Sequence, residues 1–261
     1  MDGSQVALAD ANLVDSFRAY ARWQQGAHVE DRGGVMLFAG ATHFSASFMN
    51  AAVRTDRNLP PAEAVQCAHE FFAPRNRGFT FVTRHHCDAD LNAYLARIEF
   101  TQESDSPCLF VDVPLPDKAL PTGARVVRVS SAAHIADIVA VGAEAYKAIG
   151  LHAKQVEAAF SRAQGVSDGQ VEGVIAFVED RPVSVAITVF SANSAGVYWV
   201  GTVPNARGKG FGELCTQRAT NLGFSRGAKL VTLQASVQGN SVYRRMGFRE
   251  YDRRYDFRRP E

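Results

Sequence analysis

The residues with the clearest chemistry form a glycine-rich turn, Arg207-Gly208-Lys209-Gly210-Phe211-Gly212. The turn follows a β-rich run, Val197 to Val203, and opens an amphipathic helix. The first N–H groups of a helix have no partner inside it, and with the aligned peptide dipoles they carry roughly half a positive charge. Three glycines remove the Cβ atoms that would keep a diphosphate from these groups, and Arg207 and Lys209 add charge. The pattern predicts a diphosphate-binding turn.

Two other nucleotide motifs fit this turn poorly. A P-loop needs Gly-Lys followed by Ser or Thr, whereas Lys209 is followed by Gly210. The dinucleotide motif needs an acidic residue about 20 positions on, but no acid lies between Glu213 and Glu250. A tight turn without a ligand is the remaining alternative, although turn geometry alone does not explain two cations beside three glycines.

The sequence after the turn is organised as helix, strand and helix. Apolar residues recur at helical spacing from Phe211 to Leu222, which indicates a helix packed on a sheet. Lys229 to Ala235 has the composition of a buried strand, and a short helix through Tyr243 leads to Gly247-Phe248.

This half of the chain, roughly Arg125 to Phe257, resembles the GCN5-related N-acetyltransferases (GNAT). The family's diphosphate signature, Q/R-x-x-G-x-G/A, is matched by Arg207, Gly210 and Gly212 behind Val203-Pro204. Its later signature, a Tyr before Gly-Phe, is matched by Tyr243 and Gly247-Phe248. The resemblance implies an α/β (α+β) GNAT fold with a mixed central sheet flanked by helices.

The resemblance also implies a reaction. Acetyl-CoA would be the co-substrate, and an amine would attack the thioester directly, while an N–H near Val200 to Thr202 stabilises the oxyanion. Tyr243 stands where the family has its general acid; the alternative is that Tyr243 only packs. The sequence assigns no general base. The implied cofactor-binding residues are Val200, Gly201, Thr202, Val203, Arg207, Gly208, Lys209, Gly210, Phe211, Gly212, Ser236 and Asn240.

One segment departs from the family pattern. Ser236 stands where Asn is common, and Gly239 stands where Ala is usual. Ser236 can still hydrogen-bond a pantetheine amide, and Asn240 is a candidate to compensate for the shorter side chain.

Further elements of this half follow from its patterns. A strand at Val126 to Val129 precedes a helix capped by Ser130 or Ser131. A second helix is expected from Ala153 to Arg162. Two β-rich runs, Val171 to Val178 and Pro182 to Phe190, flank a hairpin turn at Glu179 to Pro182.

The first half is separated by a Pro-containing stretch that starts at Val113-Pro114, so we expect domains at 1–120 and 125–261. Its predicted elements repeat the order of the second half, which suggests a tandem chain of two GNAT-like halves whose first copy has lost its cofactor site. At the place of the glycine turn it has Pro60-Pro61-Ala62-Glu63, without glycine. An unrelated α/β cap is the alternative. The predicted elements are helices at 6–23, 61–72 and 89–97, and strands at 35–39, 46–54, 79–83, 99–102 and 109–113.

Composition limits the setting. With 28 basic and 27 acidic residues the formal charge is +1, which argues against a nucleic-acid surface. No apolar run approaches the roughly 20 residues that span a bilayer, so we expect a soluble, cytoplasmic protein without membrane contact. His85-His86-Cys87 has no second ligand cluster nearby in the sequence, and no metal site is expected.

Two functions therefore remain open. The first is an acetyl-CoA-dependent N-acetyltransferase that acts on a small-molecule, peptide or protein amine, with Tyr243 as general acid. The second is a sensor that binds acetyl-CoA or CoA without turnover. The sequence determines neither the acceptor, nor the preferred acyl chain, nor the oligomeric state.

Overall fold

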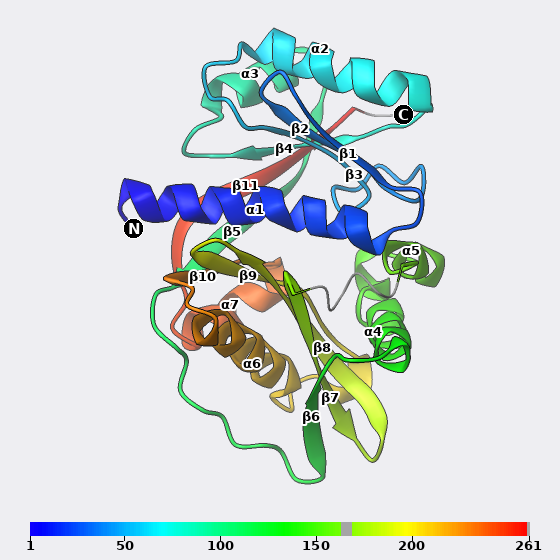
Figure 1. Cartoon of the computed structure of the whole chain (residues 1–261), viewed down its shortest axis with the longest axis vertical. Helices are drawn as coiled ribbons and strands as arrows, with labels where there is room; N and C mark the ends of the chain where they lie inside the picture. The colour runs from blue at the N-terminus through cyan, green and yellow to red at the C-terminus, as the bar shows by residue number, and fades with distance from the viewer. Residues whose placement is uncertain (163–168, 260–261) are drawn as a thin grey trace.

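The computed structural model describes residues 1–162 and 169–259. Its described strands form one mixed sheet in the order β1-β2-β3-β4-β11-β5-β10-β9-β8-β7-β6. Helices cover the sheet, and the long helix α1 crosses between the two halves of the molecule (Figure 1). The predicted α/β class is confirmed. Among the described residues, no helix combines the length and the apolar character needed to cross a bilayer.

The second half follows the predicted order closely. Ser131 caps α4 by accepting the N–H of His134 (3.2 Å), and Glu179 and Asp180 form the β7–β8 turn at φ 48° and 62°. The elements are β6 (Ala124–Arg128), α4 (Ala132–Ala145), η2 (Lys147–Ile149), α5 (Ala153–Ala159), β7 (Val171–Val178), β8 (Arg181–Ser191), β9 (Ser194–Thr202), η4 (Pro204–Ala206), α6 (Phe211–Ser225), β10 (Leu230–Gln234), α7 (Val237–Arg245) and β11 (Arg249–Arg258).

The first half differs from its prediction in three places. The strand expected at 46–54 begins only at Asn50, because residues 46–49 form a turn in which Ala46 O accepts from Met49 N (2.8 Å) and Asn50 N (2.9 Å). The strand β1 was not predicted, because its residues are mostly polar and exposed and therefore show no buried face. The two strands expected near Glu99 and Leu109 are one long strand, β5, which continues through Pro107. The elements are α1 (Gly3–Trp23), β1 (His28–Arg32), β2 (Val35–Ala39), β3 (Asn50–Arg54), α2 (Pro61–Phe72), η1 (Ala73–Arg75), β4 (Thr80–Arg84), α3 (Ala89–Arg97) and β5 (Thr101–Val111).

The two halves share a strand order and exchange their last strands. In each half three consecutive antiparallel strands precede a parallel neighbour: β1-β2-β3 then β4, and β7-β8-β9 then β10. The second half has one more antiparallel strand, β6 beside β7, which has no counterpart among the described strands of the first half. The next strand inward comes from the other half, because β11 pairs with β4 and β5 pairs with β10. The strands β5 and β11 also pair with each other at the centre of the sheet. The shared order is what a tandem repeat requires.

The helices pack on opposite faces of β9. A Cβ on Gly196 would collide with Asn12 Oδ1 of α1, while Ala195 lies on the face of Gly223 in α6. The Asn12 side chain donates to Val189 O (3.0 Å) and accepts from the Tyr198 hydroxyl (2.8 Å). The amino-terminal helix therefore belongs structurally to the second half as well as to the first. A separate apolar cluster lies between α2, α3 and the first strands.

Candidate cofactor and active site

The end of β9 has backbone groups without a strand partner. Pairing with β10 is confined to Ser194–Gly196, so residues 197–202 have no partner on that side among the described strands. On the other side, the register with β8 shifts between Tyr198 and Gly201, which leaves Trp199 and Val200 in a bulge. Trp199 has a φ of 52°, in the left-handed region. This end of β9 is where the sequence placed the acetyl group.

The glycine turn presents main-chain donors at the start of α6. Gly208 and Gly210 have φ angles of 74° and 83°, and Gly210 is the N-cap residue of α6. The first helical bond runs from Leu214 N to Gly210 O (2.9 Å). The N–H groups of residues 208–213 have no acceptor in the described part of the chain. Main-chain donors in this arrangement can bind an anion, which is the role that the sequence predicted for the turn.

Gly212 allows α6 to start close to β9. A Cβ on Gly212 would lie 3.0 Å from Thr202 Oγ1, which itself lies 2.9 Å from Ser184 Oγ. A larger residue would therefore push the first turn of α6 away from the end of β9. The close approach places the free N–H groups beside the unpaired edge of β9.

The two predicted cations of the turn have different surroundings. The guanidinium of Arg207 donates to Thr202 O (3.2 Å) and to Ala145 O (2.8 Å), at the carboxyl end of α4. Arg207 therefore links the turn to α4 as well as adding charge. Lys209 is exposed. A third cation, Lys118, was not singled out from the sequence because the linker brings it to the turn: its Nζ lies 2.7 Å from Glu213 Oε2.

Tyr243 lies on α7 with its ring folded back over Gly239. A Cβ on Gly239 would lie 2.8 Å from Tyr243 Cε2, and the ring meets Phe248 edge-on at 6.0 Å. Burial raises the pKa of the Tyr243 phenol to about 12, and the Thr216 side chain opposes that shift. The phenol is therefore protonated at neutral pH, as the predicted acid role requires.

The two polar residues predicted to bind pantetheine are engaged locally. Ser236 is the N-cap of α7, and its Oγ accepts the N–H of Gly239 (3.1 Å). Asn240 Oδ1 accepts from Arg244 Nε (3.1 Å). Both side chains stabilise the helix, so any contact with a cofactor would use the hydroxyl hydrogen or second lone pair of Ser236 Oγ and the Nδ2 of Asn240.

Aromatic rings from both halves surround the side chain of Trp199. Tyr20 and Phe48 come from the first half, and Tyr146 and Phe160 from the second. Their ring centroids lie 4.9–6.3 Å from that of Trp199. The bulge is thus held by apolar contacts that neither half supplies alone.

In the first half, side chains fill the place that corresponds to the open end of β9. Val53 is the last residue of β3 that pairs with β4, as Gly196 is the last residue of β9 that pairs with β10. The next residue, Arg54, is 1% exposed and donates to Leu59 O (3.1 Å) and Asp88 Oδ1 (3.0 Å). Because β3 ends at Arg54, the described first half has no strand segment corresponding to residues 197–202 of β9.

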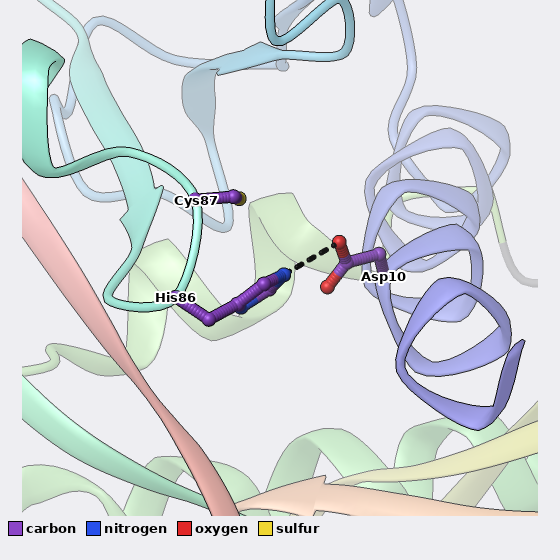
Figure 2. Close-up of side chains that lie close together, drawn as sticks. All are labelled: Asp10, His86 and Cys87. Carbon is purple, nitrogen blue, oxygen red and sulfur yellow. Dashed lines mark ion pairs between the residues drawn. The ribbon is translucent and has the colours of Figure 1, made fainter. Parts of the chain in front are cut away.

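A second polar cluster joins α1 to the loop after β4 (Figure 2). Ligand atoms of Asp10, His86 and Cys87 lie within 4.8 Å of one another, a proximity that the sequence did not predict because Asp10 comes from α1. The Asp10 carboxylate already accepts from Arg84 Nη1 (3.0 Å) and Arg57 Nη2 (3.2 Å). These guanidinium groups would repel a metal cation, so the cluster is built as an ionic network.

His86 is the centre of this network. Its Nε2 lies 3.2 Å from Asp10 Oδ2 and 3.2 Å from Arg57 Nη2, and its Nδ1 lies 2.6 Å from Asp252 Oδ2. Hydrogen bonds to Asp10, and then to Asp252, raise the pKa of His86 to about 11. The imidazolium therefore links α1, the β4–α3 loop and β11.

Comparison with known proteins identifies the second half. Residues 143–248 match the acetyltransferase (GNAT) family. No curated protein matches the sequence. Residues 143–248 are therefore identified as a GNAT domain, and the glycine turn and Tyr243 lie within this range.

Solved structures extend the likeness in fold to nearly the whole chain. A GCN5-related N-acetyltransferase from Kribbella flavida has a TM-score of 0.73 at 21% identity, covering 97% of this chain and 95% of its own. One from Sphaerobacter thermophilus has 0.64 at 15% identity, covering 90% and 84%. A tandem GNAT protein from the clavulanic acid biosynthesis pathway has 0.64 at 12% identity, covering 94% and 86%. The fold therefore matches GNAT proteins across both halves.

Proposed function

We propose that the chain is an acetyl-CoA-dependent N-acetyltransferase that uses only its second half for catalysis. The observation that carries the proposal is that two binding features lie next to each other. The free N–H groups of residues 208–213 lie at the start of α6, and the unpaired edge of residues 197–202 lies beside them. The first feature suits a diphosphate. The second suits an extended amide-bearing arm, which can add to a strand edge as another strand.

The residues at the end of β9 would act on the acetyl group. The amine nitrogen attacks the thioester carbonyl carbon, the C–S bond breaks, the amine loses one proton and the sulfur gains one. Main-chain N–H groups at the Trp199-Val200 bulge can stabilise the oxygen that becomes negative. Removal of one such donor in other enzymes costs about 10²–10³ in turnover.

Tyr243 would donate to the leaving sulfur. Its phenol remains protonated because burial raises its pKa to about 12. A thiol has a pKa of about 8.5, so complete proton transfer from this phenol is uphill, whereas a hydrogen bond to the developing thiolate is favourable. Tyr243 is therefore proposed to stabilise the leaving group as its bond to carbon breaks.

The first half is proposed to support the site without binding a cofactor. Arg54 and its partners fill the corresponding position, and Pro60-Pro61 opens α2 where the second half has glycines. Its structural contributions are α1 and the aromatic rings that surround Trp199.

The test is thiol release from acetyl-CoA across a panel of primary amines, with wild type and Tyr243→Phe side by side. We expect amine-dependent release by wild type and a loss of about 10²-fold or more in Tyr243→Phe. Tight CoA binding without release by any amine would instead favour the sensor, the alternative that the sequence left open. No binding of acetyl-CoA would reject both.

A further inference from the structure

The linker between the two halves lies along α6 and is hydrogen-bonded to it. Asn221 and Leu115 exchange two hydrogen bonds: Leu115 N donates to Asn221 Oδ1 and Asn221 Nδ2 donates to Leu115 O, both at 2.8 Å. One turn nearer the start of α6, Asp117 Oδ1 accepts from Arg218 Nη1 (3.1 Å) and Gln217 Nε2 (3.3 Å). Lys118 then reaches Glu213 (2.7 Å). The linker therefore runs antiparallel to α6 and reaches its first turn at Lys118, before it continues to β6.

This course places Lys118 at the glycine turn. A Cβ built on Gly210, the N-cap residue, would lie 3.5 Å from Lys118 Cε and 3.8 Å from Lys118 Nζ. The side chains of Lys118 and Glu213 are each 34% exposed, so the ammonium group lies at the surface of the turn rather than inside the core. Its position is fixed upstream by the buried Leu115 and the Asn221 amide.

The carboxylate of Glu213 is the partner that a bound diphosphate would displace from Lys118. Glu213 lies in the first turn of α6, the turn whose N–H groups are proposed to take the diphosphate. A diphosphate at those N–H groups would bring at least two negative charges next to both side chains. It would attract Lys118 and repel Glu213.

We propose that Lys118 is a cofactor ligand supplied by the linker, which exchanges the Glu213 carboxylate for the diphosphate of CoA when CoA binds. This inference rests on the proposed function. It adds a residue outside the GNAT signatures and makes cofactor affinity depend on the connection between the two halves.

The experiment measures dissociation constants by titration calorimetry for two ligands, CoA and S-acetylpantetheine, which lacks both the diphosphate and the phosphorylated adenosine of CoA. For Lys118→Ala, we expect CoA affinity to fall about tenfold, the effect of one lost charged hydrogen bond. The affinity for S-acetylpantetheine should not change. Lys118→Arg should keep most of the CoA affinity because it keeps the charge. Lys229→Ala, which removes an exposed lysine beyond the other end of α6, is the matched control and should change neither constant.

Glu213→Gln is expected to change the affinity for CoA in the opposite direction. Removing the competing carboxylate should tighten CoA binding about threefold, and the gain should vanish in the double variant Lys118→Ala/Glu213→Gln. Equal CoA affinity in wild type and Lys118→Ala, or an equal loss for both ligands, would overturn the proposal while leaving the proposed function standing. Failure of wild type itself to bind CoA would overturn the proposed function as well.

Discussion

The ring of Tyr243 occupies space that a side chain at Gly239 would need, because an ideal Cβ on Gly239 would lie 2.8 Å from Tyr243 Cε2 and 3.3 Å from its Cζ. The two residues lie one turn apart on α7. The sequence showed Gly239 as a departure from the usual alanine, and the structure gives a physical consequence. The position of the phenol depends on the missing methyl group.

Gly239→Ala should therefore impair turnover without unfolding the protein. The tyrosine ring is the flexible partner and would move, and a displacement of about 1 Å at a catalytic group can cost up to about 10²-fold. The midpoint of thermal unfolding should hold or rise, since alanine is the better helix former. Steady-state kinetics and calorimetry test both effects. Gly3→Ala, in the first turn of α1 with open space around it, is the control. Unchanged turnover in Gly239→Ala would show that the observed ring position is not the working one.

Gly210→Ala should weaken CoA binding by about tenfold or more, because the φ of 83° strains any residue with a Cβ and the added methyl group would stand beside the proposed diphosphate site. The strain alone should lower the free energy of unfolding by about 1–2 kcal/mol. Gly227→Ala separates the two effects. Gly227 has a φ of 85° and open space around it, just beyond the other end of α6. It should show the same loss of stability with unchanged CoA affinity, and a similar weakening in both variants would remove the turn from the cofactor site.

The sequence predicted those features of the molecule that depend on residues close together in the chain. Glycines that need left-handed backbone angles and the Ser131 cap were found where predicted. The amphipathic helix after the turn was also found. Each depends on residues within a few positions of one another, so the pattern contains the necessary information.

Contacts between segments far apart in the sequence could not be predicted from such local patterns. The pair Lys118–Glu213 joins a linker to a helix start, and nothing in the spacing of either residue indicates the other. The exchange of β5 and β11 between the two halves could not be predicted either. Periodicity shows that a strand is buried but not which strand lies beside it. The hydrogen bond from Arg207 to the end of α4 could not be predicted for the same reason.

His86→Gln should lower the free energy of unfolding at pH 6.5–7 by about 1–3 kcal/mol, because it leaves Asp10 and Asp252 without their shared imidazolium partner. The pH dependence has a definite sign. The folded-state pKa of His86 is raised to about 11, so its contribution is complete below the unfolded pKa of about 6.5 and is lost as the pH rises toward 11.

Urea unfolding of both proteins between pH 6 and pH 8 tests this dependence, in a range below the ordinary ionisation of cysteine. The difference in stability between wild type and His86→Gln should shrink steadily above pH 6.5. His85→Gln, a neighbouring exposed histidine, is the control. A constant difference across the range would mean that His86 is not held as an imidazolium.

Cutting the chain in the linker after Val113 should leave neither half able to fold alone. The strand β10 would keep only its short pairing with β9 over Leu230–Thr232, and β4 would lose β11. Together, the two fragments can rebuild the central β5–β11 pair. We therefore expect each fragment to be insoluble or unfolded when expressed alone, and co-expression to give a complex that unfolds cooperatively and binds CoA. A soluble fragment 114–261 that bound CoA as tightly as the whole chain would show that the exchanged strand does not hold the GNAT domain together, and that the first half is dispensable for cofactor binding.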